Sequence, residues 1–380
     1  MRILHTADWH LGRVLHGTRL IDDQAHILDQ IVRIVEEARP DVVLIAGDLY
    51  DRAVPPPDAV ELMDDTLCRI VLGFGIPVIA IAGNHDSPQR TAFGSRILGR
   101  QRLHVAGPFG PPEPVVLEDR HGPITIWPIP YADPPTARLA LGDEAITTHD
   151  HAMTAACAGL AAHGGDCRAV LMAHAFVQGG SECESERPLS VGGSGAVSGV
   201  QFAGFSYVAL GHLHRPQTAG RNAVRYSGSP LKYSFSEADH RKSVSLVEID
   251  AAGVATVEDI ALTPRRDLRI LEGTIAELTT GGLQGDREDY LSVLLTDEGA
   301  VYDAMARLRQ VYPNVLHVGR SFLRRPVGEG PAAASHRRLG PVDHFAAFFS
   351  FVEGQELSES QRRVIEDTVE GLEQADREVV

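Results

Sequence analysis

The sequence predicts an α/β protein with two packed sheets flanked by helices, followed by a small α+β unit and a C-terminal helix pair. Three observations lead to this prediction. Five apolar runs each end in a small residue followed by Asp, Asn or His, amphipathic segments separate the first three runs, and short β-type runs without helices follow the fifth. Alternation of buried strands with amphipathic helices is typical of layered α/β domains.

The first part of the chain is expected to alternate strands and helices. A short N-terminal strand is followed by a helical segment, 22–39, whose apolar residues recur three or four positions apart until Pro40 ends it. A strand at 42–46 precedes a second helix, 58–72, and a third strand begins at Ile76. This is the order of elements in a layered α/β domain.

Two further apolar runs, 170–174 and 207–210, continue the pattern of buried strands. The later β-type runs, which end near Leu262, indicate a second sheet packed on the first. The segment 178–199 is rich in Gly, Ser and Glu, and it is either a functional loop or a mobile surface loop.

We predict four parts of the chain, divided at the TPRRD stretch, 263–267, and at a Pro/Gly/Ala-rich stretch. The small α+β unit reads as strand, helix, strand, helix, strand, and the apolar face of its second helix consists of Val301, Met305, Leu308 and Val311 or Tyr312. In the terminal helix pair, the first helix carries three Phe residues, and Ser358 opens a capping box with Gln361. The apolar stripe that follows the capping box consists of Val364, Ile365, Val369 and Leu372. The expected boundaries are 1–264 for the main domain, 265–325 for the α+β domain, 326–341 for the linker and 342–380 for the helix pair.

Composition restricts the possible functions. The chain has 380 residues, 43% of them hydrophobic, and a formal charge of -16, which argues against a free-standing nucleic-acid binder. Its four cysteines, Cys68, Cys157, Cys167 and Cys183, show no CxxC spacing, and the first strand begins almost at Met1. No apolar run approaches the roughly 20 residues needed to span a membrane. We therefore expect a cytoplasmic protein without a membrane partner.

Polar side chains gather at the ends of the five apolar runs. Carboxyl ends of buried strands are where α/β sheets collect ligands. A donor set of carboxylate, amide and imidazole without thiolate suits Mn²⁺, Fe²⁺, Zn²⁺ or Mg²⁺, and seven ligands suit two ions that share a carboxylate and clamp a phosphoryl group. A lone strand-end His is more often a satisfied hydrogen-bonding residue, but all five runs carry such groups. The candidate metal ligands are Asp8, His10, Asp48, Asn84, His174, His212 and His214.

The series DWH, GDLYD, GNHD, a later strand-end His and GHLH resembles the calcineurin-like metallophosphoesterase superfamily over roughly residues 1–262. The resemblance implies a metallophosphoesterase sandwich in which Asp8, His10 and His214 hold one ion, Asn84, His174 and His212 hold the other, and Asp48 bridges the two. It also implies that His85 faces the scissile phosphate as a catalytic residue. Asp86 would orient His85, although capping of the turn at Ser87 and Pro88 is an alternative.

Four stretches, HTADWHLG, CESERPLSVGG, YVALGHLHRPQ and RYSGSPLKYSFSE, are similar to the SbcD family of bacterial nuclease subunits. This resemblance implies a Mn²⁺-dependent DNA nuclease that works as a homodimer in a heterotetramer with an SbcC-type ABC ATPase. The α+β unit would be a DNA-capping domain and the helix pair would bind the ATPase. Where eukaryotic and archaeal relatives have a His, this chain has Asp51, to which we assign no catalytic role.

An ATPase partner that binds the duplex would also account for DNA cleavage by an acidic chain, and local arginines would complete the DNA-binding surface. Two other classes of function stay open. One is a metallophosphoesterase for a small nucleotide or a phosphoprotein, against which the additional C-terminal residues speak. The other is a scaffold that has lost catalysis, against which the complete ligand set speaks. The candidate basic residues are Arg90, Arg96, Arg100, Arg102, Arg320, Arg324 and Arg325.

Overall fold

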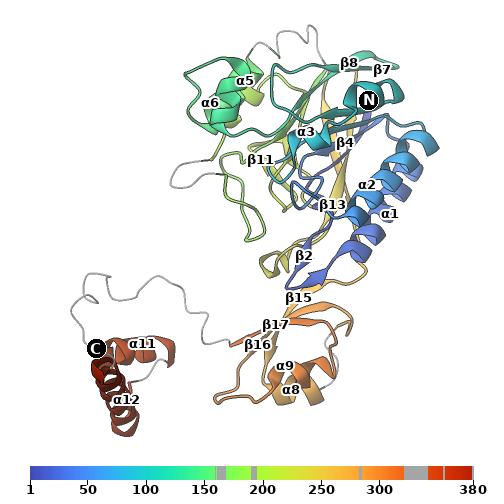
Figure 1. Cartoon of the computed structure of the whole chain (residues 1–380). Helices are drawn as coiled ribbons and strands as arrows, with labels where there is room; N and C mark the ends of the chain where they lie inside the picture. Colours follow the sequence, from blue (N-terminus) through green and yellow to red (C-terminus); the bar gives the residue numbers. More distant parts are fainter. Residues whose placement is uncertain are drawn as a thin grey trace. The chain divides into compact units, whose positions relative to one another are not determined.

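The computed structural model describes residues 1–158, 160, 168–189, 195–281, 285–320, 341–353 and 356–378 (Figure 1). It divides into two compact units, Met1–Arg269 and Ile270–Val380. Within the described ranges, no helix is both long and apolar enough to cross a membrane. Of the predicted linker, only Pro341 lies within these ranges. Cys167, Arg324 and Arg325 lie outside them.

The first unit contains two six-stranded sheets. In the first sheet β1, β4, β5 and β6 are parallel, and β13 is antiparallel to β1 and to β14. In spatial order its strands are β14 (Ala255–Ala261), β13 (Ser243–Ile249), β1 (Arg2–Thr6), β4 (Val42–Ala46), β5 (Val78–Ile81) and β6 (Leu103–Ala106).

The second sheet is parallel through β12, β10, β9 and β8, with antiparallel strands at both edges. Its order is β11 (Gln217–Ala219), β12 (Arg221–Tyr226), β10 (Tyr207–Gly211), β9 (Ala169–His174), β8 (Gly122–Ile129) and β7 (Val115–Asp119).

The predicted two-sheet architecture is confirmed, but the expected membership of the second sheet is wrong. We expected the three late β-type runs to form it. Instead β13 and β14 extend the first sheet, and only β12 joins β9 and β10. The reason is pairing: β13 hydrogen-bonds beside β1 along Arg2–His5, a long-range contact that local sequence does not encode. The five strands that carry candidate ligands are therefore divided between the two sheets.

The two sheets bury a shared apolar core. Ile3, Leu44 and Ile79 of the first sheet pack in one cluster with Val170 and Tyr207 of the second. Residues at intervening positions of β9 and β10, such as Leu171 and Leu210, face the opposite way and pack with α6 (His149–Cys157). Both faces of these strands are thus covered, which explains why they appear in the sequence as continuous apolar runs.

Helices cover the outside of the first unit (Figure 1). The two amphipathic segments form α1 (Ile21–Ala38) and α2 (Pro57–Cys68), and α2 continues as a π-helical turn to Gly73. Figure 1 shows α1 and α2 side by side along one flank of the unit and α5 and α6 on another. The remaining elements of this unit are β2 (Val14–Leu15), β3 (Thr18–Arg19), α3 (Pro88–Thr91), α4 (Ser95–Leu98), α5 (Pro134–Leu141) and α6 (His149–Cys157).

The two sheets come into close contact at the carboxyl ends of β4 and β10. A Cβ atom on Gly211, at the end of β10, would collide with the carbonyl oxygen of Ala46, at the end of β4. A Cβ on Gly83 would similarly collide with Asp48. Glycine at these positions lets two backbones and the polar side chains that follow them share one small volume.

The second unit contains all five elements that its sequence predicts. They are β15 (Leu268–Gly273, which begins in the first unit), α8 (Ile275–Thr280), β16 (Tyr290–Leu295), α9 (Ala304–Arg309) and β17 (Val315–Arg320). The three strands form one sheet with β16 in the centre. Leu308 and Tyr312, on the apolar face predicted for the second helix, are buried against it.

The helix pair comprises α11 (Pro341–Glu353) and α12 (Glu359–Glu378). The predicted capping box is present, since the N–H of Ser358 donates to Gln361 Oε1 at 2.9 Å and the N–H of Gln361 donates to Ser358 Oγ at 3.3 Å. Phe345 is 40% exposed and Phe348 is 62% exposed. The side chain of Leu372, predicted to continue the apolar stripe of α12, lies outside the described residues.

Candidate metal centre

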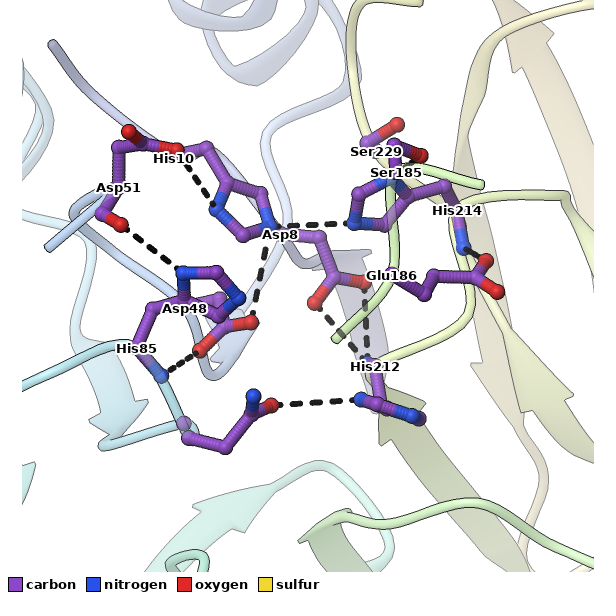
Figure 2. Close-up of polar contacts among 12 residues, drawn as sticks. Asp8, His10, Asp48, Asp51, His85, Ser185, Glu186, His212, His214 and Ser229 are labelled. Carbon is purple, nitrogen blue, oxygen red and sulfur yellow. Dashed lines mark hydrogen bonds and ion pairs between the residues drawn. The ribbon is translucent and has the colours of Figure 1, made fainter. Parts of the chain in front are cut away.

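The candidate ligands lie in the loops that follow β1, β4, β5 and β10 and, for His174, at the last residue of β9, and these strand ends meet at one place (Figure 2). Among the described residues, eight that are not glycine have positive φ, and four of them are Asp8, His10, Asp48 and His212. Such backbone conformations are costly for ordinary residues and concentrate at functional sites. The strain therefore coincides with the ends of the ligand-bearing strands.

Asp8, His10 and His214 form a first group, with one potential ligand atom from each within 4.8 Å of the others. All three side chains are buried. The Nε2 atoms of His10 and His214 face each other at 3.1 Å (Figure 2). Asp8 is held by the backbone N–H of His212, which donates to Oδ1 at 2.9 Å.

A second group forms around Asn84. Its Oδ1 lies 2.8 Å from Nε2 of His174 and 3.3 Å from Nδ1 of His212. Nδ1 of His174 is 3.0 Å from the carbonyl oxygen of Ala46, an acceptor, so this nitrogen carries the proton and donates it. In the neutral ring, Nε2 then presents its lone pair toward Asn84.

Asp48 lies between the two groups. Its Oδ2 is 3.5 Å from Nε2 of His10 in the first group and 3.5 Å from Nε2 of His174 in the second. Its Oδ1 accepts the backbone N–H of His85 at 2.8 Å. One carboxylate oxygen thus faces ligands from both sheets, which is the position expected of a group shared between two ions.

These donors fit divalent metal ions. Oδ1 of Asn84 and Oδ2 of Asp48 both face Nε2 of His174, at 2.8 and 3.5 Å, and Nε2 of His212 is buried without a partner among the described residues. Burial raises the pKa of Asp8 to about 7. Burial likewise lowers the pKa of His10 and His212 well below the usual range, so both rings are neutral. Burial opposes the charged form of His174, yet Asp48 and Asp8 raise its pKa to about 9, so the position favours positive charge. Oxygens and imidazole nitrogens that converge beside buried carboxylates suit a cation among them.

His85 is separate from both groups but close to them. Its ring lies edge-on to that of His10, with centroids 4.7 Å apart. Nδ1 donates to the backbone carbonyl oxygen of Asp51 at 2.9 Å, so Nε2 is turned away from this anchor. The ring is half-buried, which leaves it accessible to a substrate.

The backbone of Asp51 contacts His85, and its side chain contacts Arg13 and His10. Its Oδ1 accepts from Nη1 of Arg13 at 2.7 Å and lies 3.7 Å from Nδ1 of His10. The carbonyl group, which any residue would supply, is thus the part that orients the His85 ring.

The expected roles of Asp86 need correction. Its carboxylate accepts the backbone N–H groups of Leu49, Tyr50 and Gly83 at 2.9 to 3.0 Å. Among the described residues, the hydrogen bonds of this carboxylate include neither the His85 ring nor the turn at Ser87. It instead joins the loop after β4 to the loop after β5, and so sets the distance between Asp48 and Asn84.

Sequence reasoning missed the residues that surround His214. Ser185, Glu186, Glu237 and Lys242 are buried beside it. The signal for the first three was their occurrence within CESERPLSVGG and RYSGSPLKYSFSE, stretches quoted above for their resemblance and not for any chemistry, and Lys242 lies in neither stretch. For residues 185–186, the contacts with His214 favour the functional interpretation of the 178–199 loop.

Cys183, Glu186 and His214 form another group with the spacing of metal ligands. The Glu186 oxygens already accept the backbone N–H groups of Cys183 and His214, each at 2.6 Å. A cation here would have to displace backbone donors. The group therefore connects the 178–189 segment to the loop after β10.

Comparisons with known proteins cover almost the whole chain. The model of the calcineurin-like phosphoesterase family matches residues 1–216, and that of the type 5 capsule protein repressor C-terminal domain matches residues 264–353. The SbcD subunit of the nuclease SbcCD from Staphylococcus saprophyticus is 34% identical over 379 residues, which is 98% of each chain.

Two solved structures are more distant. A dimetal phosphatase from Danio rerio is 13% identical, with a TM-score of 0.41 over 69% of this chain and 98% of that one. A protein of Thermus thermophilus is 14% identical, with a TM-score of 0.38 over 68% of this chain and 98% of that one.

Proposed function

This chain belongs to the calcineurin-like phosphoesterase family, and we propose that it is a manganese-dependent DNA nuclease. It is a metal-dependent hydrolase of phosphate esters. The more specific proposal rests on the sequence similarity of this chain to a nuclease subunit over 98% of both chains. The similar region includes the C-terminal part beyond the phosphoesterase match. A small-substrate phosphoesterase has no evident need for that part.

The proposed centre holds two divalent ions. Asp8, His10 and His214 would hold the first, Asn84, His174 and His212 the second, and Asp48 both. When bound, such a pair of ions polarises a phosphoryl group and supplies a nucleophile at neutral pH. The protein's own part is to fix seven donors in a buried volume where two sheets meet.

His85 is proposed as the catalytic side chain. Its Nδ1 is occupied by the Asp51 carbonyl oxygen, so Nε2 is the nitrogen that can meet a substrate. From there it would hydrogen-bond to the scissile phosphate and stabilise or protonate the departing oxygen. Asp86 contributes indirectly by fixing the loops on which His85 and Asp51 lie.

The function is tested by cleavage of a DNA duplex with blocked ends and of single-stranded DNA. We expect phosphodiester cleavage with Mn²⁺ and much less with Mg²⁺, because Mg²⁺ prefers all-oxygen octahedral sites and the proposed donor set has four imidazoles. Equal or higher activity with Mg²⁺ alone would contradict the assigned ligands. Cleavage of small phosphodiesters with no cleavage of any DNA would instead favour a small-substrate enzyme.

The proposed partner is an SbcC-type ABC ATPase, with two copies of each chain in a heterotetramer acting on duplex ends, hairpins and single strands. The partner would supply the electrostatic attraction to DNA that a chain of charge -16 lacks. Residues 265–325 would cap the DNA, and the pair of helices in 342–380 would bind the ATPase. Support for this binding surface comes from the apolar groove between α11 and α12, lined by Phe345, Phe349, Leu357, Val364 and Ile365.

Ending the chain after Arg325 tests the partner proposal. The shortened protein should keep its metals and its Mn²⁺-dependent activity on single-stranded DNA, because every candidate ligand lies before residue 215. It should lose co-purification with the ATPase and ATP-dependent processing of duplex ends. Full retention of the ATPase, or global unfolding, would show that the helices instead belong to the core.

A further inference from the structure

A chain of buried polar contacts leads away from the metal centre through His214. It runs from His214 to Ser185, from Ser185 to Glu237 and from Glu237 to Lys242. All four side chains are at least nine-tenths buried. Three of these residues have no place in the proposed ligand set, and Ser185 is 52 positions from Glu237 in the sequence.

The donor and acceptor in each of these hydrogen bonds can be assigned in order from Lys242, because its ammonium group can only donate. Its Nζ contacts the carbonyl oxygen of His214 at 2.8 Å, Oγ of Ser229 at 2.8 Å and Oε2 of Glu237 at 2.5 Å. The three protons of an ammonium group are thereby used. The charged Lys242 keeps Glu237 ionised, and an ionised carboxylate can only accept.

Glu237 then fixes the direction at Ser185. Oε1 of Glu237 accepts the backbone N–H of Tyr233 at 3.0 Å and the hydroxyl of Ser185 at 2.5 Å. A serine hydroxyl has one proton, and Ser185 gives it to Glu237. In its 2.7 Å contact with Nδ1 of His214, Ser185 must therefore be the acceptor. Nδ1 carries the proton, and Nε2, which faces His10, is the nitrogen free to bind a cation.

We propose that Ser185 is a positioning residue, which keeps the Nδ1 proton on His214 so that Nε2 is presented to the first metal position. The inference rests on the proposed metal centre. Hydrogen bonding to the second ring nitrogen of a metal-binding histidine fixes its tautomer and orientation, and loss of such a partner typically weakens metal binding by 10- to 100-fold. Glu186, which accepts the backbone N–H of His214, holds the same residue from its main chain.

The contacts also predict a substitution that would move the His214 proton from Nδ1 to Nε2. In Glu237→Gln, the side-chain oxygen should turn to Lys242, because an NH₂ group there would face an ammonium. The NH₂ group then faces Ser185 and donates to it, so the serine proton is directed to Nδ1 of His214. The proton of a neutral His214 moves to Nε2, and the first metal position loses a ligand without any change in side-chain volume.

The test is isothermal titration of the metal-stripped full chain with Mn²⁺, with histidine-selective ¹⁵N spectra of the Zn²⁺-loaded proteins. Ser185→Ala and Glu237→Gln should bind one of two Mn²⁺ ions 10- to 100-fold more weakly, and Ser185→Thr, which keeps the hydroxyl, should restore binding. The control is Ser229→Ala, since the Ser229 hydroxyl contacts Lys242 and the Leu231 carbonyl oxygen, and only its backbone N–H contacts His214. Wild-type spectra should show a protonated Nδ1 on His214.

The outcomes separate this inference from the proposed function. A wild-type chain that takes up no Mn²⁺ contradicts the metal centre itself. Wild-type chain that binds two ions, with Ser185→Ala and Glu237→Gln binding both equally well, overturns the role of Ser185 alone. Equal weakening in Ser229→Ala would also overturn it, because the effect would then come from packing of the network. If Ser185→Ala does not fold, as thermal unfolding would show, Glu237→Gln and Ser185→Thr decide the question.

Discussion

Replacing Asp48 with alanine should empty or disorder both metal positions and reduce phosphodiesterase activity by on the order of 10³-fold or more. The reason is geometric, because Oδ2 of Asp48 is equidistant, at 3.5 Å, from Nε2 of His10 and of His174. Asp8 also lies 3.8 Å from Nδ1 of His174, but that nitrogen donates to the Ala46 carbonyl oxygen, so Asp48 is the carboxylate that faces Nε2 atoms of both groups. Elemental analysis of the purified variant measures the metal content directly.

Asp51→Asn is the matched control for Asp48→Ala. Asp51 is a neighbouring carboxylate that lies 3.7 Å from Nδ1 of His10 and pairs with Arg13, but its contacts do not include the second group. The control should keep both ions. Full occupancy of either position in Asp48→Ala would show that the shared ligand has been placed wrongly.

His85→Ala should retain both metals and bind DNA, yet lose cleavage by roughly 10²- to 10⁴-fold, the usual contribution of a positioned acid or base. Its ring is anchored through Nδ1 to a backbone carbonyl oxygen, and Nε2 is the atom available to a substrate. Metal titration and single-turnover cleavage, measured on the same preparation, separate binding from chemistry.

The same Asp51→Asn variant also serves as the control for His85. The anchor of His85 is the backbone oxygen of residue 51, so the variant should keep most of the cleavage activity that His85→Ala loses. Loss of a metal ion from His85→Ala would contradict a catalytic role and would place His85 among the ligands.

Much of the fold could be predicted from the sequence because its central strands are buried on both faces. Apolar runs at 42–46 and 170–174 have no exposed position, and the helices between the early strands have one apolar face each. The pairing of β13 with β1 could not be predicted, since it depends on contacts between residues more than 200 positions apart.

The candidate ligands were predictable for a related reason. Each lies at the end of a strand or in the loop that follows it, and the carboxyl ends of neighbouring parallel strands meet at one edge of a sheet. Asp86 also follows a strand, but three backbone N–H groups compete for its carboxylate, and only the folded loops reveal them. Ser185 lies in a loop, Glu237 in the 3₁₀ turn Phe235–Glu237 and Lys242 immediately before β13, and no local pattern relates them to His214.

Anomalous diffraction from crystals of the full chain grown with Mn²⁺ tests the central claim most directly. We expect two peaks, one on each side of the Asp48 carboxylate. The first should be in contact with Asp8, His10 and His214, and the second with Asn84, His174 and His212. A single peak, a pair of peaks that does not include Asp48, or a peak only at Cys183 and Glu186 would contradict the two-ion centre proposed for this chain.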